Sequence, residues 1–126
     1  MTRSALIVDD DDDNCRILGA LLPRVGLEPL VACDGAEALR MVQGKSLALV
    51  ITELYLPTGA SRCFAQVVKG HPYLASVPVL VYSVHCTEAD MRWAAECGCE
   101  GFVAKPARWS ELEPAINRLL ADRPLS

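Results

Sequence analysis

Side chains suited to phosphoryl chemistry stand directly behind the apolar runs of this sequence. Asp9 and Asp10 follow the first run, Glu53 the third, Ser83 the fourth and Lys105 the fifth. Carboxylates held close together repel one another, and a hard divalent cation such as Mg²⁺ relieves that repulsion by taking oxygen ligands. A lysine ammonium and a serine hydroxyl suit the oxygens of a phosphoryl group. These side chains together predict phosphoryl transfer to an acidic side chain with help from Mg²⁺.

Five short apolar runs would have to position these side chains. They are rich in Val, Ile and Leu without clean alternation, which is typical of strands buried on both faces. The runs are ALIV (5–8), LEPLVA (27–32), LALVI (47–51), VPVLVY (77–82) and GFVA (101–104). Segments with the apolar spacing of helices lie between and after these runs. One helix would present an apolar face of Leu18, Leu21, Leu22 and Val25, and the last helix a face of Leu112, Ile116, Leu119 and Leu120.

Capping patterns mark where three helices should begin. An acid follows a potential N-cap by three residues in the pairs Asp34 and Glu37, Thr87 and Asp90, and Ser110 and Glu113. Pro114 would then fall near the fourth position of the last helix, which is late for a proline, so we expect that helix to begin irregularly.

Strand and helix alternate five times along the chain. Such alternation predicts parallel strands joined by right-handed crossovers, hence a three-layer α/β/α sandwich with a five-stranded parallel sheet. Ligands of such sheets bind beyond the carboxyl ends of the strands. Residues 9, 10, 53, 83 and 105 should therefore converge at one edge.

Composition favours one globular domain over residues 1–126. Hydrophobic residues make up 52% of the chain, and the net charge is −4. Five of the 16 acidic residues form the run Asp9 to Asp13, which leaves 11 acids against 12 bases, so the acidity is local and no basic stripe predicts nucleic-acid binding. We expect no membrane span and no signal peptide, hence a cytoplasmic protein.

Six cysteines lie mostly within apolar patterns, at positions 15, 33, 63, 86, 97 and 99. We expect them to be small, reduced core residues. The pair Cys97 and Cys99 is a weak metal signal because no second cysteine pair or spaced histidine pair completes four ligands.

The acidic run allows two other interpretations. Asp9, Asp11 and Asp13 occupy positions 1, 3 and 5 of a calcium loop, but Asn14 stands where that loop needs glycine and Ala20 where it needs glutamate. Asp9 and Asp11 also have the spacing of haloacid-dehalogenase phosphatases, which usually need a longer chain. Residues 11–13 are better explained as solvated charges at a helix N-terminus.

Six motifs in order resemble the receiver domain of two-component response regulators over essentially the whole chain. They are LIVDDD, CDGAEAL, VITELYLP, PVLVYS and the pair AECGCEGF with GFVAKP. The resemblance implies a flavodoxin-like fold with strand order 2-1-3-4-5 and a Lys105–Pro106 peptide bond that is commonly cis. It also implies roles: Asp10 and the Tyr55 carbonyl as direct Mg²⁺ ligands, Asp9 as a ligand through water, Lys105 on the phosphoryl group, and Ser83 with Phe102 as the conformational switch.

Glu53 departs from the family, because it stands where the phosphorylated aspartate is expected. The extra methylene moves the carboxylate by about 1.5 Å, and a misplacement of about 1 Å can slow an in-line transfer on the order of 10²-fold. Ala60 and Ser61 replace the usual Asp-Gly of the following loop. We therefore expect an atypical receiver that is not an enzyme, binds Mg²⁺ weakly at most, and works independently of phosphorylation.

Two alternatives remain open at this point. One is a competent receiver that takes a phosphoryl group from a histidine kinase, and the other is a small Mg²⁺-dependent phosphatase. The resemblance implies a signalling partner, such as a histidine kinase, on the face formed by the fourth helix, the fifth strand and the fifth helix. Trp93 and Trp109 would contribute to that face, through which the chain could also form a homodimer. His85 lies near the rim of the site, and residues 121–126 end the chain or begin a linker.

Overall fold

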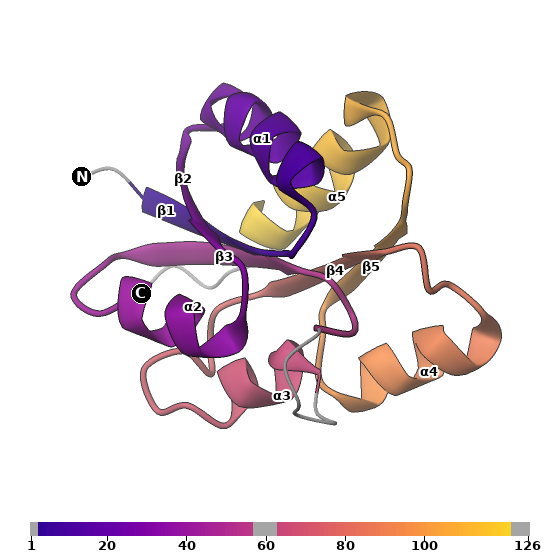
Figure 1. The fold of residues 1–126 in the computed structure, drawn as a ribbon. Coiled ribbons are helices and arrows are strands. Elements are labelled where there is room, and N and C mark those ends of the chain that lie inside the picture. Colours follow the sequence, from indigo (N-terminus) through magenta and orange to yellow (C-terminus); the bar gives the residue numbers. More distant parts are fainter. Residues whose placement is uncertain (1–2, 57–62, 122–126) are drawn as a thin grey trace.

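The computed structural model describes residues 3–56 and 63–121 as a parallel sheet between two layers of helices (Figure 1). The strands are β1 (Arg3–Val8), β2 (Leu27–Ala32), β3 (Leu47–Thr52), β4 (Val79–Ser83) and β5 (Gly101–Ala104). Their order in the sheet is β2-β1-β3-β4-β5, and every neighbouring pair is parallel. The predicted sandwich and strand order are confirmed.

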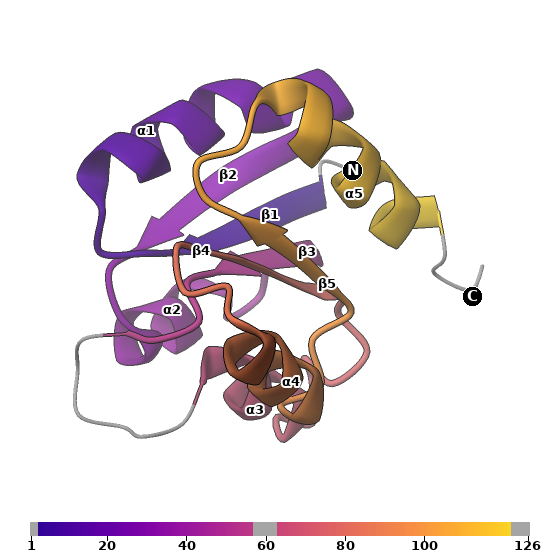
Figure 2. The same ribbon diagram turned by 90° about the vertical axis from the view of Figure 1, so that its right-hand side faces the viewer.

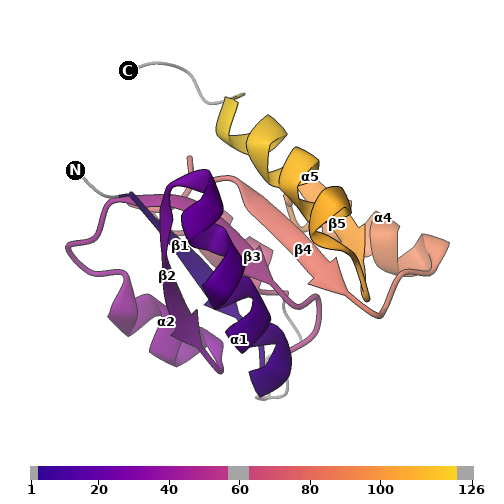
Figure 3. The same ribbon diagram turned by 90° about the horizontal axis from the view of Figure 1, so that it is seen from above.

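The helices divide between the two faces of the sheet. They are α1 (Asp12–Leu21), α2 (Gly35–Met41), α3 (Phe64–Lys69), α4 (Glu88–Glu96) and α5 (Trp109–Ala121). α1 and α5 cover one face, and α2, α3 and α4 cover the other (Figures 1 and 2). Seen from above, α1 lies on the β2 side of its face and α5 on the β5 side (Figure 3).

Each central strand buries both of its faces, as the unbroken apolar runs predict. Along β1, Leu6 and Val8 belong to the hydrophobic core beneath α2, α3 and α4, whereas Ala5 and Ile7 belong to the core beneath α1 and α5. All four side chains are fully buried. Alternate residues therefore anchor the sheet to opposite helical layers.

The edge strand β2 explains why a proline is tolerated within the sheet. β2 pairs with β1 on one side only, and Pro29 lies opposite Ala5 in that pairing. A proline has no N–H to donate to a second neighbour, so prolines within sheets occur on edge strands.

The first helix is shorter than the apolar spacing predicts. α1 ends at Leu21, and a 3₁₀ turn, η1 (Leu22–Val25), continues the chain to Gly26. Pro23 near the start of that turn lacks the N–H needed to extend the α-helix. Gly26 then adopts φ 78°, a left-handed conformation that suits glycine and turns the chain into β2.

Two of the three predicted N-caps are correct. Asp34 accepts a hydrogen bond from the Glu37 N–H over 2.8 Å, and Thr87 forms a complete capping box with Asp90. The prediction at Ser110 is wrong because α5 begins one residue earlier, at Trp109. Arg108 precedes the helix, and its N–H donates to Glu111 Oε1 over 3.1 Å, the reciprocal half of a cap. Pro114 lies inside α5.

Several sequence predictions fall on parts of the chain beyond this description. Pro57, and Ala60 and Ser61 where the family usually has Asp-Gly, lie between the two described ranges. Residues 122–126 follow the second range. Within the described ranges, no helix is long and apolar enough to cross a membrane.

Candidate functional site

Lys105 joins the carboxyl ends of β1 and β3 through two buried ion pairs. Its ammonium lies 2.7 Å from Asp9 Oδ2 and 2.8 Å from Glu53 Oε2. The three side chains are at most 10% exposed. The structure therefore brings together three of the five predicted site residues around a cation that the protein itself supplies.

The backbone ladder of the sheet fixes these three residues where the strands end. The Asp9 N–H donates to the Ala32 carbonyl over 3.1 Å, and the Glu53 N–H donates to the Val8 carbonyl over 3.0 Å. The Lys105 N–H donates to the Ser83 carbonyl over 2.9 Å. Parallel pairing thus continues one residue beyond the strands, and the side chains meet at a common edge.

Every carboxylate oxygen of Asp9 and Glu53 already accepts a hydrogen bond. Asp9 Oδ1 accepts from the Asp11 N–H over 2.9 Å, and Oδ2 accepts from Asn14 Nδ2 over 2.8 Å in addition to Lys105. Glu53 Oε1 accepts from the Leu54 N–H over 3.1 Å. Sequence analysis missed the role of Asn14, although its position in the first turn of α1, five residues after Asp9, is a usable signal.

The acidic surroundings of Lys105 keep its ammonium charged. Burial by itself would lower the pKa of Lys105, because a low-dielectric environment disfavours the charged form. Hydrogen bonds to Asp9 and Glu53, and the attraction of both carboxylates, outweigh burial and raise the pKa above its ordinary value of 10.5.

The carboxylate oxygens at this edge are chemically suitable ligands for Mg²⁺, but Lys105 already contacts two of them. Asp10 is exposed, and within residues 3–56 and 63–121 no three Asp, Glu, His or Cys side chains gather closely enough to hold a metal ion. Mg²⁺ bound to Asp9 Oδ2 or Glu53 Oε2 would compete with the Lys105 ammonium for that oxygen. The ligand set of Asp9, Asp10, Glu53 and the Tyr55 carbonyl stays a prediction.

Ser83 and Phe102, the expected switch pair, lie on the neighbouring strands β4 and β5. Ser83 is fully buried, and its hydroxyl accepts a hydrogen bond from the His85 N–H over 3.0 Å. Phe102 is half-buried against the core beneath α2, α3 and α4, and it pairs with Val81 in the sheet. Their switch role stays a prediction.

Tyr55 links the segment after β3 to the start of α4, a connection that sequence analysis missed. Its ring meets the His85 imidazole edge-on, with centroids 5.1 Å apart. Its hydroxyl donates to Asp90 Oδ1 over 2.8 Å. Nothing in the local sequence predicts a contact across 35 positions, so only the fold reveals it.

Trp93 and Trp109 are both half-buried. Trp93 packs on the core beneath α2, α3 and α4, and Trp109 packs on the core beneath α1 and α5. Trp109 and Lys105 also line a cavity of about 370 Å³ between α1 and α5. An interface role for either tryptophan stays a prediction.

The six cysteines are free thiols, as expected, but the prediction that they are core residues is wrong for Cys33 and Cys86, which are exposed. Burial raises the pKa of the Cys97 thiol to about 12 and that of the Cys99 thiol to about 11. A thiol must lose its proton to ligate a metal, so these environments disfavour a metal site at Cys97 and Cys99.

Comparison with known proteins identifies the kind of domain that carries this site. Residues 5–117 match the family model of the response regulator receiver domain. The transcriptional regulatory protein GltR of Pseudomonas aeruginosa is 28% identical over 118 residues, which cover 94% of this chain and 49% of that protein. The polar-differentiation response regulator DivK of Brucella ovis is 25% identical over 122 residues, which cover 97% of this chain and 99% of DivK.

A solved structure repeats the fold. The receiver domain of the sensor histidine kinase PA1611 of Pseudomonas aeruginosa, with a magnesium ion coordinated in its active-site cleft, superposes with a TM-score of 0.83 at 19% identity. The superposition covers 97% of this chain and 100% of that domain. The chain spans about half the length of GltR but nearly all of DivK, so equivalent domains occur both within larger proteins and alone.

Proposed function

Because this chain belongs to the family of response regulator receiver domains, we propose that it acts as a protein-interaction module of two-component signalling that works without phosphorylation. Receiver domains interact with histidine kinases and other signalling proteins. The observation that carries the proposal is the 2.8 Å ion pair between Glu53 and Lys105. The carboxylate at the acceptor position contacts the lysine directly, which supports a role that does not depend on phosphorylation.

The hydrogen bonds of Glu53 argue against efficient phosphoryl transfer. Transfer requires one carboxylate oxygen to attack phosphorus in line, and such reactions depend mostly on positioning. Both Glu53 oxygens already have donors, Lys105 on one and the Leu54 N–H on the other. Attack would require Glu53 to break one of these bonds and place a carboxylate that is one methylene longer than aspartate.

Magnesium has a secondary place in this proposal. Mg²⁺ would neutralise the carboxylates and orient a phosphoryl group if Asp9, Asp10 and Glu53 could hold it. Asp9 and Glu53 support the prediction through their chemistry, and their pairing with Lys105 supports weak binding. The proposal assigns no catalytic turnover to the chain.

The face formed by α4, β5 and α5 is the proposed partner surface. Trp93 on α4 and Trp109 at the start of α5 are each half-buried. Half-exposed tryptophans supply large contact areas in protein interfaces. A signalling partner such as a histidine kinase, or a second copy of this chain, would bind there.

Intact-mass spectrometry after incubation with acetyl phosphate and Mg²⁺ tests the proposal. We expect no +80 Da adduct on the native chain and a clear adduct on Glu53→Asp, which restores the shorter carboxylate. Glu53→Gln is the matched control, since it keeps the length and removes the nucleophile.

A stoichiometric adduct on the native chain that is absent from Glu53→Gln would overturn the proposal. It would establish instead the competent receiver that uses Glu53. The placement of Asp9 and Lys105 keeps that alternative chemically reasonable, because both could serve phosphoryl transfer once rearranged.

A further inference from the structure

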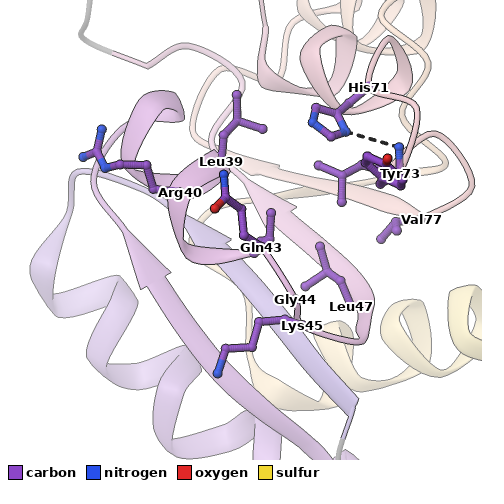
Figure 4. A pocket seen from close by; sticks show the side chains of 11 residues that line it. Leu39, Arg40, Gln43, Gly44, Lys45, Leu47, His71, Tyr73 and Val77 are labelled. Atoms are coloured by element: carbon purple, nitrogen blue, oxygen red, sulfur yellow. Dashed lines mark hydrogen bonds between the residues drawn. The ribbon is translucent and has the colours of Figure 1, made fainter.

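A second cavity lies far from Glu53, at the opposite end of β3. It has a volume of about 620 Å³ and opens where α2 ends, β3 begins and the α3–β4 connection passes (Figure 4). Leu47, the first residue of β3, lies on its wall, whereas Glu53 follows the last. At about 3.3 Å per residue, the two sites are roughly 20 Å apart. We call this cavity the α2–β3 pocket.

The floor of the α2–β3 pocket is apolar and built from the protein core. Val42, Leu74 and Val77 are buried members of the core beneath α2, α3 and α4, and Leu39 and Leu47 pack against that core. A floor that belongs to the core keeps its shape without a ligand. The volume lies within the range of about 300–1,000 Å³ that is usual for small-molecule sites.

Two aromatic side chains form one edge of the pocket. His71 and Tyr73 stand opposite Leu39 (Figure 4), with their ring centroids 5.8 Å apart. The Tyr73 N–H donates to His71 Nδ1 over 3.3 Å, which holds the imidazole in place. Tyr73 is 86% exposed. A flat ring entering the pocket would cover this aromatic surface, since aromatic pairs prefer offset or edge-to-face contact.

The opposite edge of the pocket is cationic. Arg40 and Lys45 line it with Gln43, and no acidic side chain does. Both residues line the pocket, while in Figure 4 their charged ends point away from His71 and Tyr73 toward solvent. Within the described part of the chain, neither cation forms an ion pair. Two unpaired cations beside an apolar cavity, in a chain of net charge −4, favour an anion at this rim.

We propose that the α2–β3 pocket binds a small aromatic acid: a flat apolar body carrying one carboxylate, sulfonate or phosphate group. The body lies on the apolar floor against His71 and Tyr73. The acidic group lies at the rim, where the exposed side chains of Arg40 and Lys45 turn inward to meet it. The pocket shares no residue with the site at Asp9, Glu53 and Lys105, so this binding is a property separate from the proposed signalling function.

Fluorescence titration with 1-anilinonaphthalene-8-sulfonate tests the proposal, because this probe joins two aromatic groups to one sulfonate. We expect saturable one-to-one binding. Backbone amide shifts in the ¹H–¹⁵N spectrum should change at residues 39–47 and 71–77. The double variant Arg40→Gln/Lys45→Gln should weaken binding about 10-fold, the order expected when two exposed charge contacts are lost.

Two matched controls distinguish recognition of the sulfonate charge from non-specific hydrophobic binding. Arg24→Gln/Arg118→Gln removes two exposed cations elsewhere and should leave the affinity unchanged. The neutral analogue N-phenyl-1-naphthylamine should bind more weakly than the sulfonate and respond equally to both double variants. Tyr73→Ala, a change at an exposed side chain, should also weaken sulfonate binding.

Three results would overturn the proposal: non-saturating binding, shift changes outside these segments, or equal affinity in both double variants. None of these results bears on phosphorylation of Glu53. Probe binding therefore tests the pocket proposal alone, and the phosphorylation assay tests the signalling proposal alone.

Discussion

The Tyr55 hydroxyl donates to the same carboxylate that caps α4. Asp90 accepts from Tyr55 through Oδ1 over 2.8 Å and from the Thr87 N–H through Oδ2 over 3.2 Å. Tyr55 stands two residues after Glu53, so the segment leaving the acceptor position is tied directly to the first turn of α4. A movement at residue 53 could reach the proposed partner face through this one side chain.

Tyr55→Phe should raise the pKa of Asp90. The hydrogen bond from Tyr55 is the main reason that the pKa of Asp90 lies below its ordinary value of 3.8, and the variant removes only that bond. A lowered carboxyl pKa stabilises the fold above the unfolded pKa, and that contribution disappears as pH falls through the folded pKa. The stability difference between native chain and variant should therefore vanish in acid.

Carboxyl resonances followed by NMR from pH 2 to 7 would measure this pKa. Tyr73→Phe is the matched control, because no hydrogen bond of the Tyr73 hydroxyl is found in the described part of the chain. An unchanged Asp90 titration in Tyr55→Phe would contradict the prediction.

Lys105→Met should destabilise the fold by about 3–5 kcal/mol at pH 7, the usual cost of leaving buried charges unpaired. Asp9 and Glu53 would both lose their cation while remaining at most 9% exposed. Urea unfolding monitored by circular dichroism gives the free energy of unfolding. Adding Glu53→Gln should restore part of the loss, because one buried charge disappears. A double variant no more stable than Lys105→Met would count against the charge explanation.

Alkaline unfolding should reveal the stability that the charged form of Lys105 contributes. Hydrogen bonds to Asp9 and Glu53 raise the pKa of Lys105 despite its burial. A raised lysine pKa stabilises the fold below the unfolded pKa, about 10.4, and this stability is lost as pH rises through the folded pKa. Between pH 9 and 12, in EDTA, the thermal midpoint of the native chain should fall more steeply than that of Lys105→Met. Lys45→Met, at an exposed lysine, should follow the native curve.

Removing Lys105 should strengthen magnesium binding. Asp9 Oδ2 and Glu53 Oε2 would be free to bind Mg²⁺ in Lys105→Met, whereas both accept from the ammonium in the native chain. Trp109 lines a cavity with Lys105, and its fluorescence should follow the titration. We expect weak binding by the native chain and at least about 10-fold tighter binding by the variant, a difference of about 1.4 kcal/mol. Equal Mg²⁺ affinities of the native chain and Lys105→Met would show that Lys105 does not compete with the metal for the carboxylates.

The sheet was predictable because its signals are local. The runs at 27–32 and 101–104 coincide with β2 and β5, and parallel pairing then places Asp9, Glu53 and Lys105 at one edge. The start of α5 was not predictable in the same way. Ser110 is a better N-cap by type than Arg108, but the Arg108 N–H pairs with Glu111 and shifts the helix by one residue.

The side-chain pairing within the site was also not predictable from the sequence. Repulsion between carboxylates predicts a divalent cation, which stays a prediction, but it does not predict that Lys105 pairs with Asp9 and Glu53 while Asp10 stays exposed. That outcome depends on side-chain reach and on donors such as Asn14 that saturate Asp9. The Tyr55–Asp90 contact likewise requires two loops whose approach no residue pattern specifies.

The ion pair between Lys105 and Asp9 spans 96 positions and so couples the first strand to the last. A chain growing from the ribosome would hold Asp9 and Glu53 for some time before Lys105 emerges. During that time the nascent sheet would face two acidic groups without a counter-charge, which discourages early closure. Fragments that end before β5 lack both Lys105 and the core residues of α5, and they should remain only loosely collapsed.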